Sequence, residues 1–233
     1  MKKIFFSLFL SISLFAIDLI KLPFMGVDVV HTYSNKKQEN ITIQRESDEV
    51  CMSIAINTEN FQSENLASKK VDEKCKKTFI TTKGVIQPLK LEEGITTVAE
   101  LEVLDFIYNK SSKNPSKYIL VDSRTSDWFD VGTIPSAVNI PYDELTYDED
   151  FEIEYKRAYK NLGVKILGNN KFDFSNAKTA LFFCNASWCA QSPRAIKQLI
   201  KIAYPKEKII WYRGGIASWV GVSLTLSKNI EAK

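Results

Sequence analysis

The chain has 233 residues, of which 45% are hydrophobic and 25% charged, a composition typical of one large or two small globular domains. Its formal net charge is +3, but two lysines and no acid lie within residues 1–16, so the rest of the chain carries +1. This balance argues against nucleic acid or an anionic membrane surface as a partner.

The N-terminus has the pattern of a secretory signal peptide spanning residues 1–16. Two lysines follow Met1, residues 4–15 form an apolar run broken only by serines, and Ala16 is a small residue suited to cleavage. The run is too short for a stable membrane span, although an uncleaved anchor is the alternative. We therefore expect a periplasmic or secreted protein with no stable membrane span after signal removal.

Residues 17–91 are expected to form a small, mainly-β N-terminal unit, because short β-type runs alternate with polar stretches. In an oxidising compartment the simplest disulfide joins Cys51 to Cys75, a staple that contributes about 3–4 kcal/mol in the chain-entropy model. A zinc site of all four cysteines is the alternative, but a tight Cys-x-x-Cys pair is missing and the single histidine, His31, is isolated.

No catalytic constellation is evident in this N-terminal unit. We expect it to cover or extend the main domain. Binding of a protein partner is the alternative role, because exposed connections often mediate recognition.

The main domain is expected over residues 92–226, after a linker at 88–94 and before a C-terminal tail at 227–233. The Thr97–Glu100 segment has the pattern of a helix capping box. Strands alternate with helices, which predicts an α/β fold with a parallel sheet between helices. The strands are expected at 118–122, 138–140, 179–183 and 208–213, and the helices at 101–110, 128–129, 151–162, 193–203 and 216–220.

The stretch from Thr179 to Ile196 is the most informative. An apolar strand ends in Cys184, a polar loop follows, and Ser192 and Pro193 have the residue types of an N-cap and a first helical position. Open α/β sheets bind ligands at the carboxyl ends of their strands, and a helix N-terminus favours a thiolate. Taken alone, Cys184 is better explained as a small buried residue at a strand end.

Four motifs in chain order resemble the rhodanese-like sulfurtransferase family, and the whole is similar to exported bacterial members. The resemblance covers roughly residues 95–226 and implies a rhodanese-like parallel sheet flanked by helices. The motifs are Tyr118-Ile-Leu-Val-Asp122-Ser-Arg124, the Gly132–Pro141 segment, Phe183-Cys184 and the Trp211–Trp219 segment with its Gly214-Gly215 pair.

The resemblance implies sulfur transfer. The Cys184 thiolate would attack the outer sulfur of a small donor such as thiosulfate, and a thiol or cyanide would accept the sulfur from the persulfide. Such a site needs no metal or organic cofactor. Arg194 could orient an anionic donor or point to solvent. Arg124 could orient an anionic donor or anchor two loops to each other. Backbone N–H groups of the substrate-binding loop are expected around the Cys184 sulfur; that loop comprises Asn185, Ala186, Ser187, Trp188, Ala190 and Gln191.

The sequence departs from the family pattern in ways that leave alternatives open. Thr133 replaces the usual histidine, Ser136 replaces the usual glycine, and the cysteine loop is longer. Cys189 could be a second thiol that pairs with Cys184, which would indicate a thiol–disulfide redox protein; a binding or sensing module on an altered scaffold is a further alternative. A cysteine phosphatase is excluded, because the arginine required six positions after the cysteine is Ala190.

Overall fold

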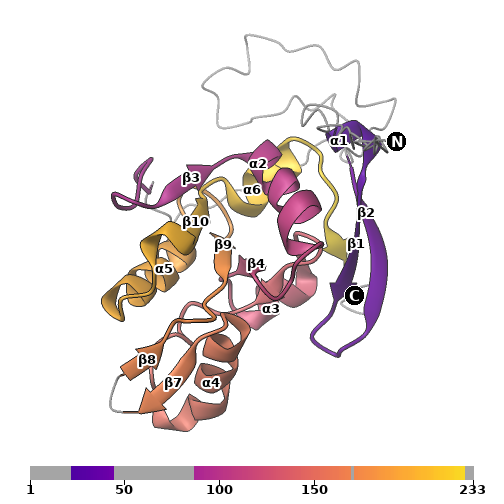
Figure 1. Cartoon of the computed structure of the whole chain (residues 1–233). Coiled ribbons are helices and arrows are strands. Elements are labelled where there is room, and N and C mark those ends of the chain that lie inside the picture. The colour runs from indigo at the N-terminus through magenta and orange to yellow at the C-terminus, as the bar shows by residue number, and fades with distance from the viewer. Residues whose placement is uncertain (1–21, 45–86, 169–170, 229–233) are drawn as a thin grey trace, which may run out of the picture.

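A computed structural model describes residues 22–44, 87–168 and 171–228. These residues form a parallel sheet between two groups of helices, with a β-hairpin at one side (Figure 1). The predicted signal peptide and the Cys51–Cys75 disulfide lie outside the described residues. Within those ranges, no helix is long and apolar enough to cross a membrane.

The central sheet has five parallel strands in the order β3-β10-β9-β4-β6, which confirms the predicted α/β class. Strand β9 lies in the middle, so Phe182 pairs with Val121 on one side and Trp211 on the other. Both faces of β9 are buried, as expected of a parallel strand between helical layers. The bounds are β3 Thr96–Val98, β4 Tyr118–Asp122, β6 Val138–Asn139, β9 Thr179–Phe183 and β10 Ile209–Tyr212.

Two hydrophobic clusters hold the helices to the sheet. On one face, α4 (Glu152–Asn161) and α5 (Gln191–Lys201) pack against Ala180 and Phe182. The other face carries Leu181 and Phe183 and is covered by four elements. These are α2 (Glu100–Asp105), the π-helical turn η5 (Phe106–Ser111), α3 (Ser126–Val131) and α6 (Gly215–Gly221).

The N-terminal hairpin belongs to the second cluster. Strands β1 (Val27–Thr32) and β2 (Gln38–Ile43) pair antiparallel, and the short helix α1 (Leu22–Met25) precedes them. The buried side of β1 ends in His31, whose Nδ1 accepts a hydrogen bond from the Ser136 N–H at 3.3 Å. Burial lowers the pKa of His31 to about 4. His31 is therefore a neutral packing residue between the hairpin and the main domain.

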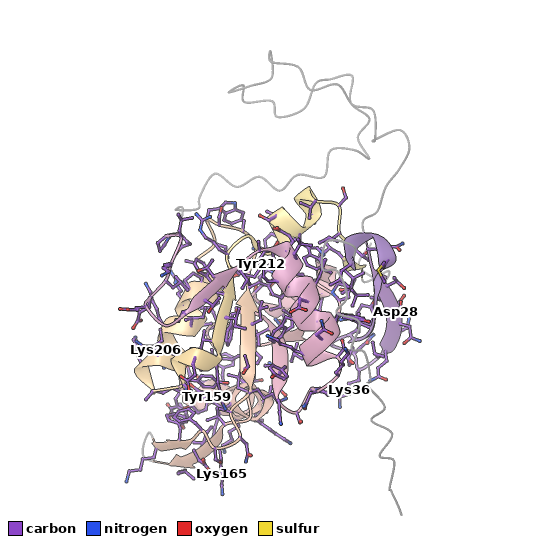
Figure 2. All side chains as sticks on the ribbon, turned by 45° about the horizontal axis from the view of Figure 1, so that its top comes forward. Asp28, Lys36, Tyr159, Lys165, Lys206 and Tyr212 are labelled. Atoms are coloured by element: carbon purple, nitrogen blue, oxygen red, sulfur yellow. The ribbon has the colours of Figure 1, made fainter. Side chains whose placement is uncertain are left out.

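Short pairings complete the fold. Strand β5 (Gly132–Thr133) pairs with β11 (Ser227–Lys228), so the first residues of the predicted tail form a strand. The hairpin of β7 (Lys165–Gly168) and β8 (Lys171–Asp173) was not predicted, and Lys165 marks it at one end of the molecule in Figure 2. Single 3₁₀ turns precede α4 and β10, at Glu149–Phe151 and Lys206–Lys208.

Two predicted helix N-caps are wrong. Thr97 lies in β3 and not in a capping box, because pairing with Trp211 of β10 outweighs the local signal. The helix starts after Ala99, whose N–H donates to the Glu102 carboxylate at 3.0 Å. Ser192 is likewise no N-cap, because α5 already begins at Gln191.

Candidate active site

The loop after β9 is held against the start of helix α6. The carbonyl oxygens of Cys184 and Asn185 accept hydrogen bonds from the N–H groups of Ile216 (3.1 Å) and Ala217 (2.8 Å). Gly215 has a φ of +57°, and a Cβ at this position would lie 2.2 Å from the Cys184 oxygen. Glycine is therefore required for this close approach, and α6 fixes the backbone that carries Cys184.

Cys184 is buried, with 2% of its surface exposed, and its sulfur accepts a hydrogen bond from Ser192, which Trp211 orients. The Ser192 hydroxyl donates to the Cys184 sulfur at 3.1 Å, and the Trp211 indole N–H donates to the Ser192 oxygen at 3.0 Å. An indole N–H can only donate. Trp211 therefore occupies an acceptor site of Ser192 and leaves the serine hydrogen directed at the sulfur.

Cys189 lies in the same loop, and neither cysteine is in a disulfide. The Cys184 thiol lies 3.5 Å from the Cys189 carbonyl oxygen, to which it donates. The neighbouring Cys184 side chain, together with the backbone N–H groups of Gln191, Asn185 and Ala186, lowers the pKa of Cys189 to about 6. The Cys189 thiol itself lies 3.8 Å from Gln191 Oε1, to which it donates. Burial, by contrast, raises the pKa of Cys184 well above that of an ordinary thiol.

This distribution of donors differs from the expectation. Of the loop N–H groups predicted to ring the Cys184 sulfur, those of Gln191, Asn185 and Ala186 instead lower the pKa of Cys189, while the hydroxyl and the backbone N–H of Ser192 act on Cys184. The two shifts run in opposite directions, so Cys189 is the more acidic of the two thiols.

Alkylation should reveal this difference as a pH dependence. A depressed pKa means that the Cys189 thiolate is populated at lower pH, so labelling of Cys189 by iodoacetamide should rise through about pH 6 and level off near neutrality. Peptide mapping over a pH series measures the midpoint. Cys184→Ala, which removes the largest contribution, should move the midpoint upward. A wild-type midpoint near 8.5, the value of an ordinary thiol, would contradict the assignment.

Arg124 connects the loop to the neighbouring strand end. Its guanidinium donates to Asp122 Oδ2 and the Gly132 carbonyl oxygen, both at 2.6 Å, and to Asn185 Oδ1 at 3.2 Å. Thr133 adds a hydroxyl donor to the same Asp122 oxygen at 2.6 Å. Arg124 and Asp122 are both buried, so the arrangement is an anchor between loops.

Arg194 occupies a different environment. It is exposed in the first turn of α5, with its guanidinium carbon 5.6 Å from the centre of the Tyr142 ring. It lines a depression of about 460 Å³ together with Lys197 and Lys201. Asp143 and Asp148 line the same depression, so its charge is mixed and it does not identify Arg194 as an anion-binding residue.

The remaining loop residues form the outer part of the site. The Ser187 carbonyl oxygen accepts a hydrogen bond from the Gln87 N–H at 2.7 Å, and Arg213 donates to the Gln87 oxygen at 2.8 Å. The chain entering the main domain therefore lies against the cysteine loop. Trp188, Ala190 and Gln191 are half-buried, whereas Asn185 and Ala186 are buried.

Sequence reasoning missed the donor role of Ser192 and the contribution of Trp211. Alternation along the strands only partly indicates that Trp211 lies near the cysteine loop. It places Phe182 and Trp211 on the same face of the sheet, where they pair in register and belong to the same core cluster. Only the strand order brings Trp211 to Ser192.

Residues 106–221 match the family model of the rhodanese-like domain. The similar solved structures include a protein from Bacillus halodurans, 16% identical with a TM-score of 0.39, where the match covers 58% of this chain and 78% of that one. A Saccharomyces cerevisiae homolog of single-domain rhodanese and the Cdc25 phosphatase catalytic domain is 18% identical, with a TM-score of 0.39 and coverage of 58% and 86%. A rhodanese-like domain from Anabaena sp. is 14% identical, with a TM-score of 0.36 and coverage of 61% and 84%. No similar sequence was found among curated proteins.

Proposed function

Because residues 106–221 of this chain are a rhodanese-like domain, we propose that the protein transfers sulfane sulfur through a persulfide on Cys184. The observation that supports this most directly is the position of Cys184 at the carboxyl end of the central strand, with the Ser192 hydroxyl directed at its sulfur. A donor at that position stabilises a sulfur anion, which is the state needed for nucleophilic attack.

The proton of Cys184 has an acceptor nearby. Cys189 lies in the same loop and has a lowered pKa, and its thiolate takes this proton as the reaction begins. The Cys184 thiolate then attacks the outer sulfur of thiosulfate, the S–S bond of the donor breaks, and sulfite leaves. The persulfide formed on Cys184 is the sulfur carrier.

Intact-protein mass spectrometry tests this proposal. Fully reduced protein treated with thiosulfate should release sulfite and gain one sulfur atom at Cys184, or release that atom as sulfide. Cys184→Ser should do neither, because a serine hydroxyl is far less acidic than a thiol. Failure of the reduced wild-type protein to release sulfite or carry sulfur with thiosulfate, polysulfide or an organic persulfide would refute sulfur transfer.

Thiol–disulfide exchange is the second candidate, supported by the contact between two unlinked thiols of different acidity. A thiolate beside a thiol is the arrangement that reacts with an external disulfide and then closes to an internal one. Mild oxidation followed by peptide mapping should give a Cys184–Cys189 bond separate from any bond of Cys51 or Cys75. Finding both loop cysteines free after oxidation would exclude this candidate.

We further propose that residues 1–16 direct export to the periplasm or beyond. The two lysines and the apolar run of residues 4–15 support this proposal. Protein isolated from its native compartment should begin just after Ala16, and N-terminal sequencing measures this. An intact Met1 in the isolated protein would contradict it.

A further inference from the structure

Resting on the proposed sulfur transfer, we propose that Cys189 resolves the Cys184 persulfide, releasing hydrosulfide and leaving a Cys184–Cys189 disulfide that only a dithiol reductant returns to the active state. The sulfur would thus leave the protein as sulfide, and the partner class is a protein or small molecule with two thiols.

The first argument is the position of Cys189. Cys189 is buried in the same loop as Cys184, and the Cys184 sulfur lies 3.5 Å from the Cys189 carbonyl oxygen. Its own N–H donates to the Ala186 oxygen at 2.9 Å, which closes a turn and holds the residue over Cys184. A nucleophile held this close to an electrophilic sulfur reacts at a high effective concentration.

Burial supplies the second argument. Cys184 is 2% exposed and Cys189 6% exposed, so any reagent from solution, donor or acceptor, must enter the loop before it can react. Cys189 is already held beside the Cys184 sulfur, with its carbonyl oxygen 3.5 Å away. The internal reaction is therefore favoured over direct attack by a monothiol or cyanide.

The steps balance. After sulfite has left, Cys189 returns its proton to the outer sulfur of the persulfide and becomes a thiolate again. This thiolate attacks the Cys184 Sγ, the Cys184 S–S bond breaks, the Sγ–Sγ bond forms, and hydrosulfide departs with the bonding electron pair. In this last exchange the Cys189 sulfur is oxidised and the sulfane sulfur is reduced to sulfide. The Cys184 sulfur was already oxidised when the persulfide formed. A dithiol then reduces the protein disulfide and is itself oxidised to a disulfide.

A single-turnover experiment tests this step. Reduced wild-type and Cys189→Ser full-length proteins are mixed with thiosulfate and cyanide without added thiol, and sulfite, sulfide and thiocyanate are measured with peptide mapping. The wild type should release one sulfide per sulfite and acquire the Cys184–Cys189 bond. In Cys189→Ser, sulfite release should be slower, because the proton acceptor of Cys184 is lost, and the sulfide released per sulfite should fall to zero and be replaced by a Cys184 persulfide or thiocyanate. Cys189→Ala should behave like Cys189→Ser, which controls for the serine hydroxyl.

The failures of the two proposals are distinguishable. If wild type and Cys189→Ser both release sulfite and both yield thiocyanate without sulfide, sulfur transfer stands and resolution by Cys189 is refuted. Equal sulfide yields in the two proteins would also refute it. If the wild type releases no sulfite, both proposals fall. Repeated turnover should be supported by dithiothreitol and not by an equal concentration of thiol groups supplied as a monothiol.

Discussion

Arg124→Met should lower the free energy of unfolding by about 3–5 kcal/mol, the usual loss when one partner of a buried ion pair is removed. Methionine fills much of the same volume but leaves Asp122, which has no exposed surface, without its cation. The Gly132 oxygen and the Asn185 amide also lose a donor, so the loop that carries Cys184 should loosen as the protein is destabilised.

Urea unfolding followed by circular dichroism measures this loss. Thr133→Val is the matched control, because it removes one neutral donor from Asp122 and retains the ion pair; it should cost about 1.5–3 kcal/mol, the usual loss of a hydrogen bond to a charged group and less than that of Arg124→Met. The double variant Asp122→Asn/Arg124→Met should be more stable than the sum of the single changes, since no charge remains unpaired. A loss below about 1 kcal/mol for Arg124→Met would show that the pair contributes no more than a neutral hydrogen bond.

Ser192→Ala should slow persulfide formation at Cys184 about 10- to 100-fold. A hydrogen bond to a charged group contributes about 1.5–3 kcal/mol, and each 1.4 kcal/mol corresponds to about tenfold in rate. The pH midpoint for reaction of Cys184 should also move upward, because the Ser192 hydroxyl opposes the effect of burial on the Cys184 pKa. Stopped-flow measurement of sulfite release over a pH series gives both quantities.

Trp211→Phe separates positioning from packing. Phenylalanine retains part of the aromatic contact in the core and removes the indole N–H that holds Ser192, while the serine hydroxyl itself remains, so the rate should fall less than in Ser192→Ala. Ser192→Ala also leaves the Trp211 indole N–H without a partner, which should lower the stability by about 1–3 kcal/mol. A purely structural role of Ser192 would cause the same loss of stability. A destabilised Ser192→Ala with an unchanged rate and pH midpoint would therefore show that the Ser192 hydroxyl does not act on Cys184.

The sequence predicts most of the main domain because local patterns there agree with the tertiary contacts. The apolar run from Thr179 to Phe183 is long enough only for a strand, and Gly163 ends the charged helix before it. Predictions failed where a local signal competed with a distant partner. Thr97 has capping chemistry but pairs with β10, and the β7–β8 hairpin has too few alternating residues to be distinctive.

The candidate site divides in the same way. Sequence alone determined that Cys184 lies at a strand tip before a helix, and that Cys189 shares its loop, because both facts follow from neighbouring residues. Tertiary structure decided which thiol receives the backbone N–H groups, because their directions depend on how α6 holds the loop through Gly215. It also shows that Ser192, predicted as a helix N-cap, donates to the Cys184 sulfur instead, because Trp211 of strand β10 orients its hydroxyl. Acidity in this loop is set by burial and by hydrogen bonds, and both are properties of the folded chain.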